Sequence, residues 1–373
     1  MDRTRPRLGV FGDVVLDIVV LHREDAAPDS DSRAAITPTA GGSAANVAVW
    51  AARSGLEVAF FGQAGDDLVG RQLRADLAAE GVAVDRPAGN LLLAASAPTG
   101  IIIVNVHGSS RTMVTDRGAN LSPPPDLIPD EALAACAWLH LTGYSFFEPG
   151  PREVAQRAVT ACRRLGVPFS ADPSSYRLLR EYGPERFLAD VDGAAVLFPN
   201  RDEARELTGR DDPAEAAAEL ARRFPVVAVK LGPDGCLVAA RGALRAVPAV
   251  RPDGLAIDPT GAGDAFAAGF LAGLLGVGLS GAAEAQAAAS AADPQAAAQS
   301  GVRLAARAVR VIGGRGRPGP CDGARTGGSP CSPAASSGPR GGGQSGGGRP
   351  VPRRARGRRP ASGPRPVPRG SRG

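Results

Sequence analysis

A regular alternation of strand-like and helix-like segments between residues 134 and 240 constrains the fold more than any other feature of the sequence. Short apolar runs are separated there by longer stretches in which apolar residues recur at helical spacing. Strands that alternate with helices favour a parallel sheet covered by helices on both faces. In such a sheet, ligand sites lie at the carboxyl ends of the strands, beside helix N-termini. The expected strands are 138–141, 167–171, 194–198, 226–230 and 236–240, and the expected helices are 151–165, 176–182, 201–207 and 213–223.

The two ends of the folded region are expected to add further elements. Residues 8–20 are rich in β-branched residues and predict a buried strand that runs into a second one. Towards the C-terminus, Asp293-Pro294 is expected to end or kink a helix, and residues 301–312 are expected to form one more helix or strand. The elements expected after the first strands are a helix at 44–53, a strand at 58–61, a helix at 68–80 and a hairpin of 100–106 with 111–115.

Residues 313–373 differ sharply in composition from the rest of the chain. They are mostly Gly, Pro, Arg, Ser and Ala, with too few large apolar residues to offset the entropy cost of ordering. Residues 301–373 carry a net charge of +15 and the preceding residues −10, so the basic character belongs to the tail. We expect a folded domain over residues 1–312 and a disordered tail over 313–373. A genuine extension and out-of-frame translation both remain open for the tail, and the abrupt change favours the second.

Cysteine usage and the N-terminal sequence indicate a cytoplasmic protein. The five cysteines are scattered, without a Cys-x-x-Cys pair or a histidine cluster, so neither a disulfide framework nor a zinc site is expected. The first apolar stretch is interrupted by Gly12, Asp13 and Asp17, which argues against a signal peptide or a membrane span.

The sharpest chemical signal is the segment Asp258-Pro-Thr-Gly-Ala-Gly-Asp264, which precedes an Ala-rich helical pattern. Small residues at a helix start let the backbone N–H groups of Ala262, Gly263 and Asp264 converge on a phosphate, so Gly261–Asp264 is the candidate anion hole. A carboxylate beside a transferring phosphoryl group can accept the proton of an attacking hydroxyl, which makes Asp264 the candidate general base. The alternative is a Gly-rich turn with an ordinary acidic residue at a helix N-terminus.

This segment, extended to Leu271, and a second segment resemble the two signatures of the ribokinase-like, or phosphofructokinase-B-type, carbohydrate kinase family. The second segment is Gly41-Gly42-Ser-Ala-Ala-Asn46-Val-Ala48, followed by Gly55 and Gly65. Two long segments in this order are far more specific than one Gly-rich loop. The resemblance covers about residues 7–280. It implies a ribokinase-like three-layer α/β/α sandwich with a mostly parallel central sheet and a small β lid from about residues 13–40 and 90–118.

The same resemblance implies an ATP-dependent kinase that phosphorylates a hydroxyl of a small sugar or sugar-like substrate. It further implies Mg²⁺ with the ATP, room for a monovalent cation such as K⁺, and a homodimer through the lid. The lid would exclude water and limit wasteful ATP hydrolysis. No membrane and no specific nucleic acid are expected as partners. A pentose, hexose, keto-deoxy sugar acid, sugar phosphate or nucleoside all stay open as the substrate.

By resemblance, the sugar site is lined by residues of the first strands and the first helix. Glycines at positions 41 and 42 let the backbone approach a ligand closely, and Asn46 offers a donor and an acceptor to sugar hydroxyls. Asp17 would bind further hydroxyls, whereas Asp13 is as readily explained as a turn residue. The alternative for Gly41, Gly42 and Asn46 is a tight turn with a helix cap.

The nucleotide side of the site is expected from two further motifs. Asn200 and Glu203 resemble an N-x-x-E element whose Glu acts near Mg²⁺, often through water, although an acid at a helix N-terminus is also favoured by the dipole. Lys230, the only lysine of the chain, begins a K-x-G-x-x-G turn that borders the nucleotide or is a plain hairpin. Asp172 either orders the phosphate region or caps a helix. The remaining expected residues are Gly232, Gly235 and Thr260 at the nucleotide and Asp258 at the metal.

Other function classes are weighed against this one. A binding protein that has lost turnover is suggested by the atypical C-terminus, where a wall of the adenine pocket is expected. A nucleoside kinase of the same fold is a second alternative, and non-specific polyanion binding by the tail is a third. Dinucleotide-dependent oxidoreduction is disfavoured, because Gly9-Val-Phe-Gly12-Asp13 lacks the G-x-G-x-x-G turn.

Overall fold

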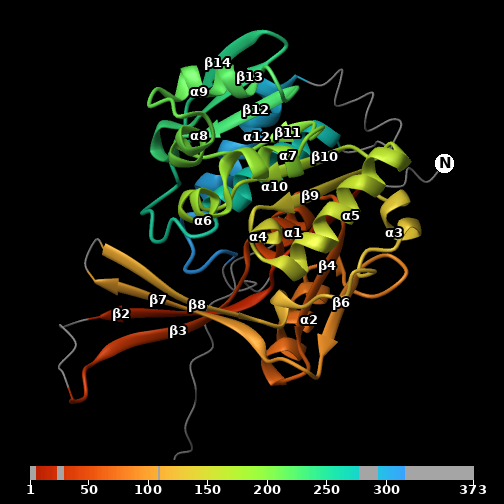
Figure 1. The fold of residues 1–373 in the computed structure, drawn as a ribbon. Coiled ribbons are helices and arrows are strands. Elements are labelled where there is room, and N and C mark those ends of the chain that lie inside the picture. The colour runs from red at the N-terminus through yellow and green to blue at the C-terminus, as the bar shows by residue number, and fades with distance from the viewer. Residues whose placement is uncertain (1–5, 23–28, 108–109, 277–292, 316–373) are drawn as a thin grey trace, which may run out of the picture. The chain divides into compact units, whose positions relative to one another are not determined.

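The computed structural model describes residues 6–22, 29–107, 110–276 and 293–315. The chain divides into two units, residues 1–321 and 322–373, and the second unit lies outside the described residues. Within the described part of the first unit, the strands form one ten-stranded and one four-stranded sheet. Figure 1 shows helices packed around the larger sheet and the smaller sheet set beside it.

The larger sheet confirms the expected α/β sandwich. Its strands are β1 (Arg7–Phe11), β4 (Glu57–Gly65), β5 (Val82–Ala83), β6 (Asn90–Ala94), β9 (Trp138–Thr142), β10 (Phe169–Asp172), β11 (Val196–Leu197), β12 (Val226–Lys230), β13 (Cys236–Ala240) and β14 (Ala243–Val247). They are ordered β14-β13-β12-β11-β10-β9-β1-β4-β5, and β6 also pairs with β4. All of these pairs are parallel except those of β13, which is antiparallel to both β12 and β14.

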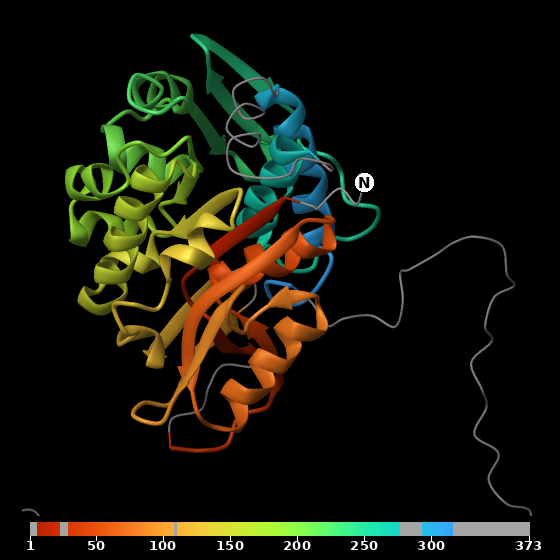
Figure 2. The same cartoon turned by 90° about the vertical axis from the view of Figure 1, so that its right-hand side faces the viewer.

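Helices cover both faces of this sheet because its strands are apolar on both sides. In β1, for example, Leu8 and Val10 belong to one core and Phe11 to the other. The first core is covered by α1 (Ser43–Arg53), α2 (Leu68–Ala79), α10 (Ala262–Leu275) and α12 (Pro294–Ala308). The second is covered by α3 (Asp130–Ala134), α4 (Tyr144–Phe147), α5 (Pro149–Leu165), α6 (Tyr176–Tyr182), α7 (Pro184–Asp190), α8 (Arg201–Thr208) and α9 (Pro213–Leu220). Figure 2 shows the teal and blue helices opposite the yellow-green ones.

The smaller sheet is the expected lid. Its strands are β2 (Val15–His22), β3 (Ala34–Gly41), β7 (Thr99–His107) and β8 (Ser110–Gly118), in the order β3-β2-β7-β8. β2 and β7 are parallel and the other two pairs are antiparallel, so the expected β7–β8 hairpin is present. The second lid segment begins at Thr99 rather than near residue 90. Residues 90–94 are β6 of the larger sheet, where the buried Asn90 side chain donates to the Leu127 carbonyl (2.8 Å).

The Asp293-Pro294 pair begins a helix, α12. Asp293 caps α12 by accepting from the Gln295 amide (3.0 Å), and Pro294 occupies the first helical position, where an N–H is not needed. Residues 277–292, which hold the helix pattern expected before this pair, lie outside the described residues. None of the helices in the described ranges is long and apolar enough to cross a membrane. Two short 3₁₀ turns, η1 (Ala119–Leu121) and η2 (Gly232–Asp234), complete the elements.

Candidate functional site

Polar residues singled out from the sequence lie at the carboxyl ends of neighbouring strands of the larger sheet. Asp172 ends β10, Asn200 follows β11, and Lys230 ends β12. These strands are parallel neighbours, and Asn200 and Lys230 are linked by an isolated parallel bridge. The N-termini of α1 and α10 lie at the same site, because side chains of Ser43 and Asn46 reach Asp264.

Asp264, on the first turn of α10, is held from two sides by α1. The Ser43 hydroxyl donates to Oδ1 of Asp264 (2.7 Å), and Nδ2 of Asn46 donates to Oδ2 (2.9 Å). Burial raises the pKa of the Asp264 carboxyl to about 6, against the effect of these two hydrogen bonds. The group is therefore ionised at neutral pH and is basic enough to accept a proton.

Lys230 brings a positive charge to the start of α10. Its ammonium group forms an ion pair with the buried Asp172 carboxylate. A Cβ atom on Gly263 would lie 3.4 Å from Nζ of Lys230, so the ammonium faces the first turn of the helix. Burial opposes the charged form, but Asp172 and Glu203 outweigh it and raise the Lys230 pKa. The ammonium and the positive end of α10 thus form one anion-attracting surface.

One backbone amide of the predicted anion hole is engaged in the turn that precedes α10. Gly261 caps the helix in the left-handed conformation (φ 75°), and the Ala262 amide donates to the Pro259 carbonyl (3.2 Å). The next first-turn amides, those of Gly263 and Asp264, point beyond the helix start by ordinary helix geometry. They remain the candidate phosphate donors, whereas the Ala262 amide is already engaged.

Asn200 and Glu203 form a capping box at the start of α8. The Asn200 amide and Nδ2 donate to the two carboxylate oxygens of Glu203 (2.8 Å each), and the Glu203 amide donates back to Asn200 (2.9 Å). Glu203 is 1% exposed, and burial raises its pKa despite the nearby Lys230 charge. Both oxygens predicted to act near Mg²⁺ are therefore engaged in stabilising the helix end.

Asp258 and Thr260 organise the loop before α10. The Thr260 amide donates to Oδ1 of Asp258 (2.9 Å), and the Gly313 amide donates to Oδ2 (2.9 Å). The ranges that the structure describes contain no group of three or more His, Cys, Asp or Glu side chains placed to hold a metal. Mg²⁺ that arrives with ATP needs only one or two protein carboxylates, so a contact by Asp258 stays a prediction and no step of the chemistry is assigned to a metal.

On the lid side, two glycines and Asp17 shape a second wall of the site. A side chain at Gly41 would collide with the Asp17 carboxylate, and one at Gly42 (φ 96°) would collide with the Asp13 carbonyl. The Asp17 side chain is buried. Burial raises its pKa to about 7, Arg315 opposes this shift, and Asp264 and Asp258 add to it. Oδ1 of Asn46 is also buried and unpartnered.

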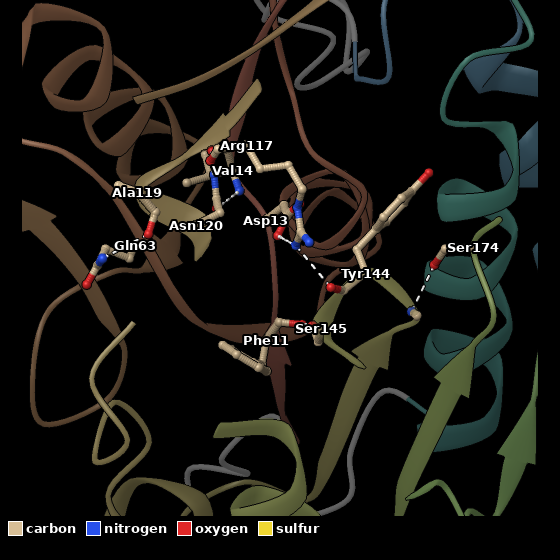
Figure 3. A network of polar contacts seen from close by, with 11 residues as sticks. Phe11, Asp13, Val14, Gln63, Arg117, Ala119, Asn120, Tyr144, Ser145 and Ser174 are labelled. Carbon is tan, nitrogen blue, oxygen red and sulfur yellow. Dashed lines mark hydrogen bonds and ion pairs between the residues drawn. The ribbon is translucent and has the colours of Figure 1, made fainter. Parts of the chain in front are cut away.

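Asp13 is occupied by an ion pair that the sequence did not reveal. Nε and Nη2 of Arg117, at the end of β8, donate to its two carboxylate oxygens (2.8 and 2.6 Å), as Figure 3 shows. Nη2 of Arg117 also donates to the Tyr144 carbonyl (3.0 Å). Both charged groups are mostly buried. Asp13 thus anchors the lid, and each of its carboxylate oxygens already accepts a bond from Arg117.

A neighbouring side chain fixes the root of the lid to the sheet. Asn120 exchanges two hydrogen bonds with the backbone of Val14, accepting from its amide (3.1 Å) and donating to its carbonyl (3.0 Å) (Figure 3). Gln63 of β4 donates to the Ala119 carbonyl nearby (2.8 Å). These buried contacts hold β2 and β8 in place where they leave the larger sheet.

The turn expected after Lys230 is a hairpin between β12 and β13. η2 lies within it, and Gly235 (φ 91°) follows in a conformation that favours glycine. The Leu231 amide donates to the Gly235 carbonyl (2.8 Å). Gly232 and Gly235 therefore shape a loop beside Lys230, as predicted, and a nucleotide contact stays a prediction.

Residues beyond the expected domain end also reach the site. The Trp50 indole donates to the Gly314 carbonyl (2.9 Å), and Nη1 of Arg53 donates to the Arg315 carbonyl (2.7 Å). With the Gly313 bond to Asp258, ordered contacts extend at least three residues past the boundary expected at 312. The signal that could have found Ser43 is its place directly after Gly42. No local signal marked residues 313–315.

Comparisons with known proteins agree with this arrangement. A family model described as "pfkB family carbohydrate kinase" matches residues 6–317. A fructokinase from Klebsiella pneumoniae is 34% identical over 73% of this chain and 86% of its own length. An ATP-dependent ribose-1-phosphate kinase from Halopiger xanaduensis is 34% identical over 67% of this chain and 79% of its own. The solved structure of a fructokinase double mutant from Vibrio cholerae, with fructose, ADP and potassium ion bound, is 26% identical, with a TM-score of 0.66 over 84% of this chain and 96% of that one.

Proposed function

Because this chain belongs to the pfkB family of carbohydrate kinases, we propose that it transfers the γ-phosphoryl group of ATP to a hydroxyl of a small sugar, with Asp264 as the general base. The observation that supports this best is the position of the Asp264 carboxylate. It is bonded to α1 on the acceptor side and lies on the first turn of α10, next to the Lys230 ammonium.

In the proposed reaction, Asp264 accepts the proton of the acceptor hydroxyl as its oxygen attacks the γ-phosphorus. The bond between that phosphorus and the bridging oxygen of ADP breaks, and ADP leaves with the bond's electron pair. Charge spreads over the phosphoryl oxygens during transfer. Lys230 and the amides of Gly263 and Asp264 are suited to stabilise this charge, since they are fixed before the reaction. Mg²⁺ arriving with ATP would supply further neutralisation.

Acceptor recognition is assigned to two buried polar side chains. Oδ1 of Asn46 has no protein partner among the described residues, Asp17 is a buried carboxyl, and sugar hydroxyls are donors that suit both. Asp13 is left out of this set because Arg117 binds it. Gly41 lets the backbone pass close to the Asp17 carboxylate, and Gly42 lets it pass close to the Asp13 carbonyl.

The test is ATP turnover with a panel of acceptors, comparing the parent with Asp264→Asn. Fructose, ribose, ribose 1-phosphate and a nucleoside cover the substrates named for similar proteins. We expect one of them to give ADP and a phosphorylated product, and Asp264→Asn to lower kcat by about 10²–10⁴-fold with acceptor binding retained. Binding is measured by calorimetry without ATP. A variant with more than a tenth of the parent rate contradicts the base assignment.

The same panel separates the alternatives. Acceptor binding without ADP formation by the parent would identify a binding protein that lacks turnover. Turnover with the nucleoside alone would identify a nucleoside kinase.

A monovalent cation remains a prediction, tested by replacing K⁺ with a large organic cation. The expected nucleotide contacts of Asn200, Gly232, Gly235 and Thr260 are tested in the same assay through the KM for ATP.

We also propose that two copies associate through the lid. Its strands carry large apolar side chains that are more than half exposed, namely Ile36, Met113 and Val114. Exposed apolar strands of this kind tend to become interfaces. Sedimentation equilibrium of the parent and of Met113→Lys tests this, with a dimer expected for the parent and a monomer for the variant.

A further inference from the structure

Two buried polar atoms near the root of the lid have no hydrogen-bond partner among the described residues. They are Oγ1 of Thr39, in β3, and Oδ1 of Asn46, on the first turn of α1. Buried hydroxyl and amide oxygens are nearly always bonded, so each of these atoms calls for a partner. Asn46 already belongs to the proposed acceptor site, whereas none of the sequence motifs includes Thr39.

The Thr39 hydroxyl lies beside Asp17. The two residues are paired across the antiparallel strands β2 and β3, so their side chains lie on the same face of the lid. The Asp17 carboxylate lies against Gly41, two residues further along β3, where an added Cβ atom would collide with it. The carboxylate and the Thr39 hydroxyl are thus neighbours on one face, yet no hydrogen bond joins them.

The chain segment after α12 connects the Thr39 hydroxyl with Asn46. A Cβ atom on Gly313 would lie 2.5 Å from Oγ1 of Thr39, and one on Gly314 would collide with the Asn46 side chain. The segment is held in this place because the Trp50 indole donates to the Gly314 carbonyl (2.9 Å). The two unpartnered oxygens therefore border the same pair of glycines.

We propose that Thr39 is a further substrate-binding residue, whose hydroxyl donates a hydrogen bond to a hydroxyl oxygen of the sugar held by Asp17 and Asn46. This assignment rests on the proposed function, because it takes the sugar to be bound at those two residues. The unpartnered amide oxygen of Asn46 can only accept, and so can an ionised carboxylate, whereas a threonine hydroxyl also donates. A sugar hydroxyl can then donate to Asp17 or Asn46 while its own oxygen accepts from Thr39.

The consequence is selectivity for sugars that carry a hydroxyl at this position. A site built to bond a hydroxyl rejects the analogue without it, because polar groups of the site are then left unpaired. One monodeoxy analogue should therefore lose affinity through Thr39. That loss should disappear when the Thr39 hydroxyl is removed.

The test compares the full-length parent, Thr39→Val and Thr39→Ser with the control Thr37→Val. Valine keeps the branched shape and removes the hydroxyl, whereas serine keeps the hydroxyl. Thr37 lies two residues earlier on the same face of β3, so its substitution is matched in strand and in chemistry.

Calorimetry without ATP gives the Kd of the best-bound compound among fructose, ribose, ribose 1-phosphate and a nucleoside, and of each of its monodeoxy analogues. Steady-state kinetics separates KM from kcat. Thermal melting followed by circular dichroism shows whether each variant folds.

We expect Thr39→Val to weaken binding of the full sugar about tenfold, with kcat within about threefold of the parent. One monodeoxy analogue should bind equally well to the parent and to Thr39→Val, because the bond is absent from both complexes. Thr39→Ser and Thr37→Val should stay within about threefold of the parent.

An unchanged Kd in Thr39→Val would overturn the proposal. So would a loss of equal size for every monodeoxy analogue, or a serine variant that behaves like the valine variant, since the effect would then come from packing. If Thr39→Val does not fold, Thr39→Ala is judged by the same criteria. Binding without phosphorylation in the parent would refute the kinase proposal and leave these comparisons intact, whereas a parent that binds none of the four compounds overturns the assignment of Thr39.

Discussion

Replacing Asp17 by Asn is expected to stabilise the folded protein at alkaline pH while weakening acceptor binding. The Asp17 pKa is raised from 3.8 to about 7, mainly by burial. A carboxyl whose pKa is higher in the folded state binds its proton more tightly there, so its favourable contribution is fully present below pH 3.8 and is lost as the pH rises through 7. At about 1.4 kcal/mol per pKa unit, Asp17 lowers the free energy of unfolding relative to its value at strongly acidic pH. This loss is about 1.5 kcal/mol near pH 5 and about 4 kcal/mol above neutral pH.

The assay is urea unfolding of the parent and Asp17→Asn between about pH 5 and pH 9. The free energy of unfolding of the variant, relative to the parent, should rise by about 2–3 kcal/mol over this range. Packing changes caused by the amide are independent of pH and cancel in that difference. Asp126→Asn, at an exposed position, is the matched control and should give a flat difference. A flat difference for Asp17→Asn as well would refute the reasoning, because it would mean that burial does not raise the Asp17 pKa.

Three further results are expected at the site and at the lid. Asn46→Ala should lower kcat as well as raise the acceptor KM, because its Nδ2 holds Asp264 (2.9 Å); an unchanged kcat in steady-state kinetics would contradict this. Lys230→Gln should lower kcat by about 10²-fold or more, and an effect confined to the KM for ATP would show that the ammonium only binds. Arg117→Ala should cost about 3–5 kcal/mol in urea unfolding, since it leaves Asp13 buried and unpaired, and that loss should shrink when Asp13 is also changed to Asn.

The wild-type rate is also expected to depend on pH through Asp264. Its pKa of about 6 means that kcat falls as the pH drops through that value, because the protonated carboxyl cannot accept the hydroxyl proton. A pH–rate profile of the parent measures this directly. A kcat that stays constant down to about pH 4.5 would exclude Asp264 as the base.

Sequence patterns predicted the parts of this molecule that depend on local rules. Strands 226–230 and 236–240 and helix 176–182 were expected with the bounds that the structure shows, because apolar periodicity and turn residues mark them. Asn46 and Asp264 were both assigned to one site from their motifs, and the hydrogen bond that joins them was not predicted. Such positions are constrained by backbone geometry that short segments already encode.

The unpredicted parts depend on contacts between distant segments. Nothing near Asp13 indicates that Arg117 will bind it, so a buried lid anchor looked like a substrate ligand or a turn residue. Residues 313–315 have the composition of a disordered tail, yet glycine is what allows the chain to pass so close to Asn46 and Thr39. Composition alone missed this because the stabilising contacts are supplied by Trp50, Arg53 and Asp258, not by the segment itself.

The tie between Arg53 and Arg315 also sets the order in which the protein can mature during synthesis. The two bonded residues are separated by 262 positions, so the wall beside Asp17 cannot close until the ribosome has added the last of them. At about 5–20 residues per second, the first helix waits roughly 13–50 s for that segment. Through this interval the nascent chain carries its N-terminal acceptor residues without Arg315. A growing polypeptide of this sequence should therefore not capture sugar until residues 313–315 have emerged.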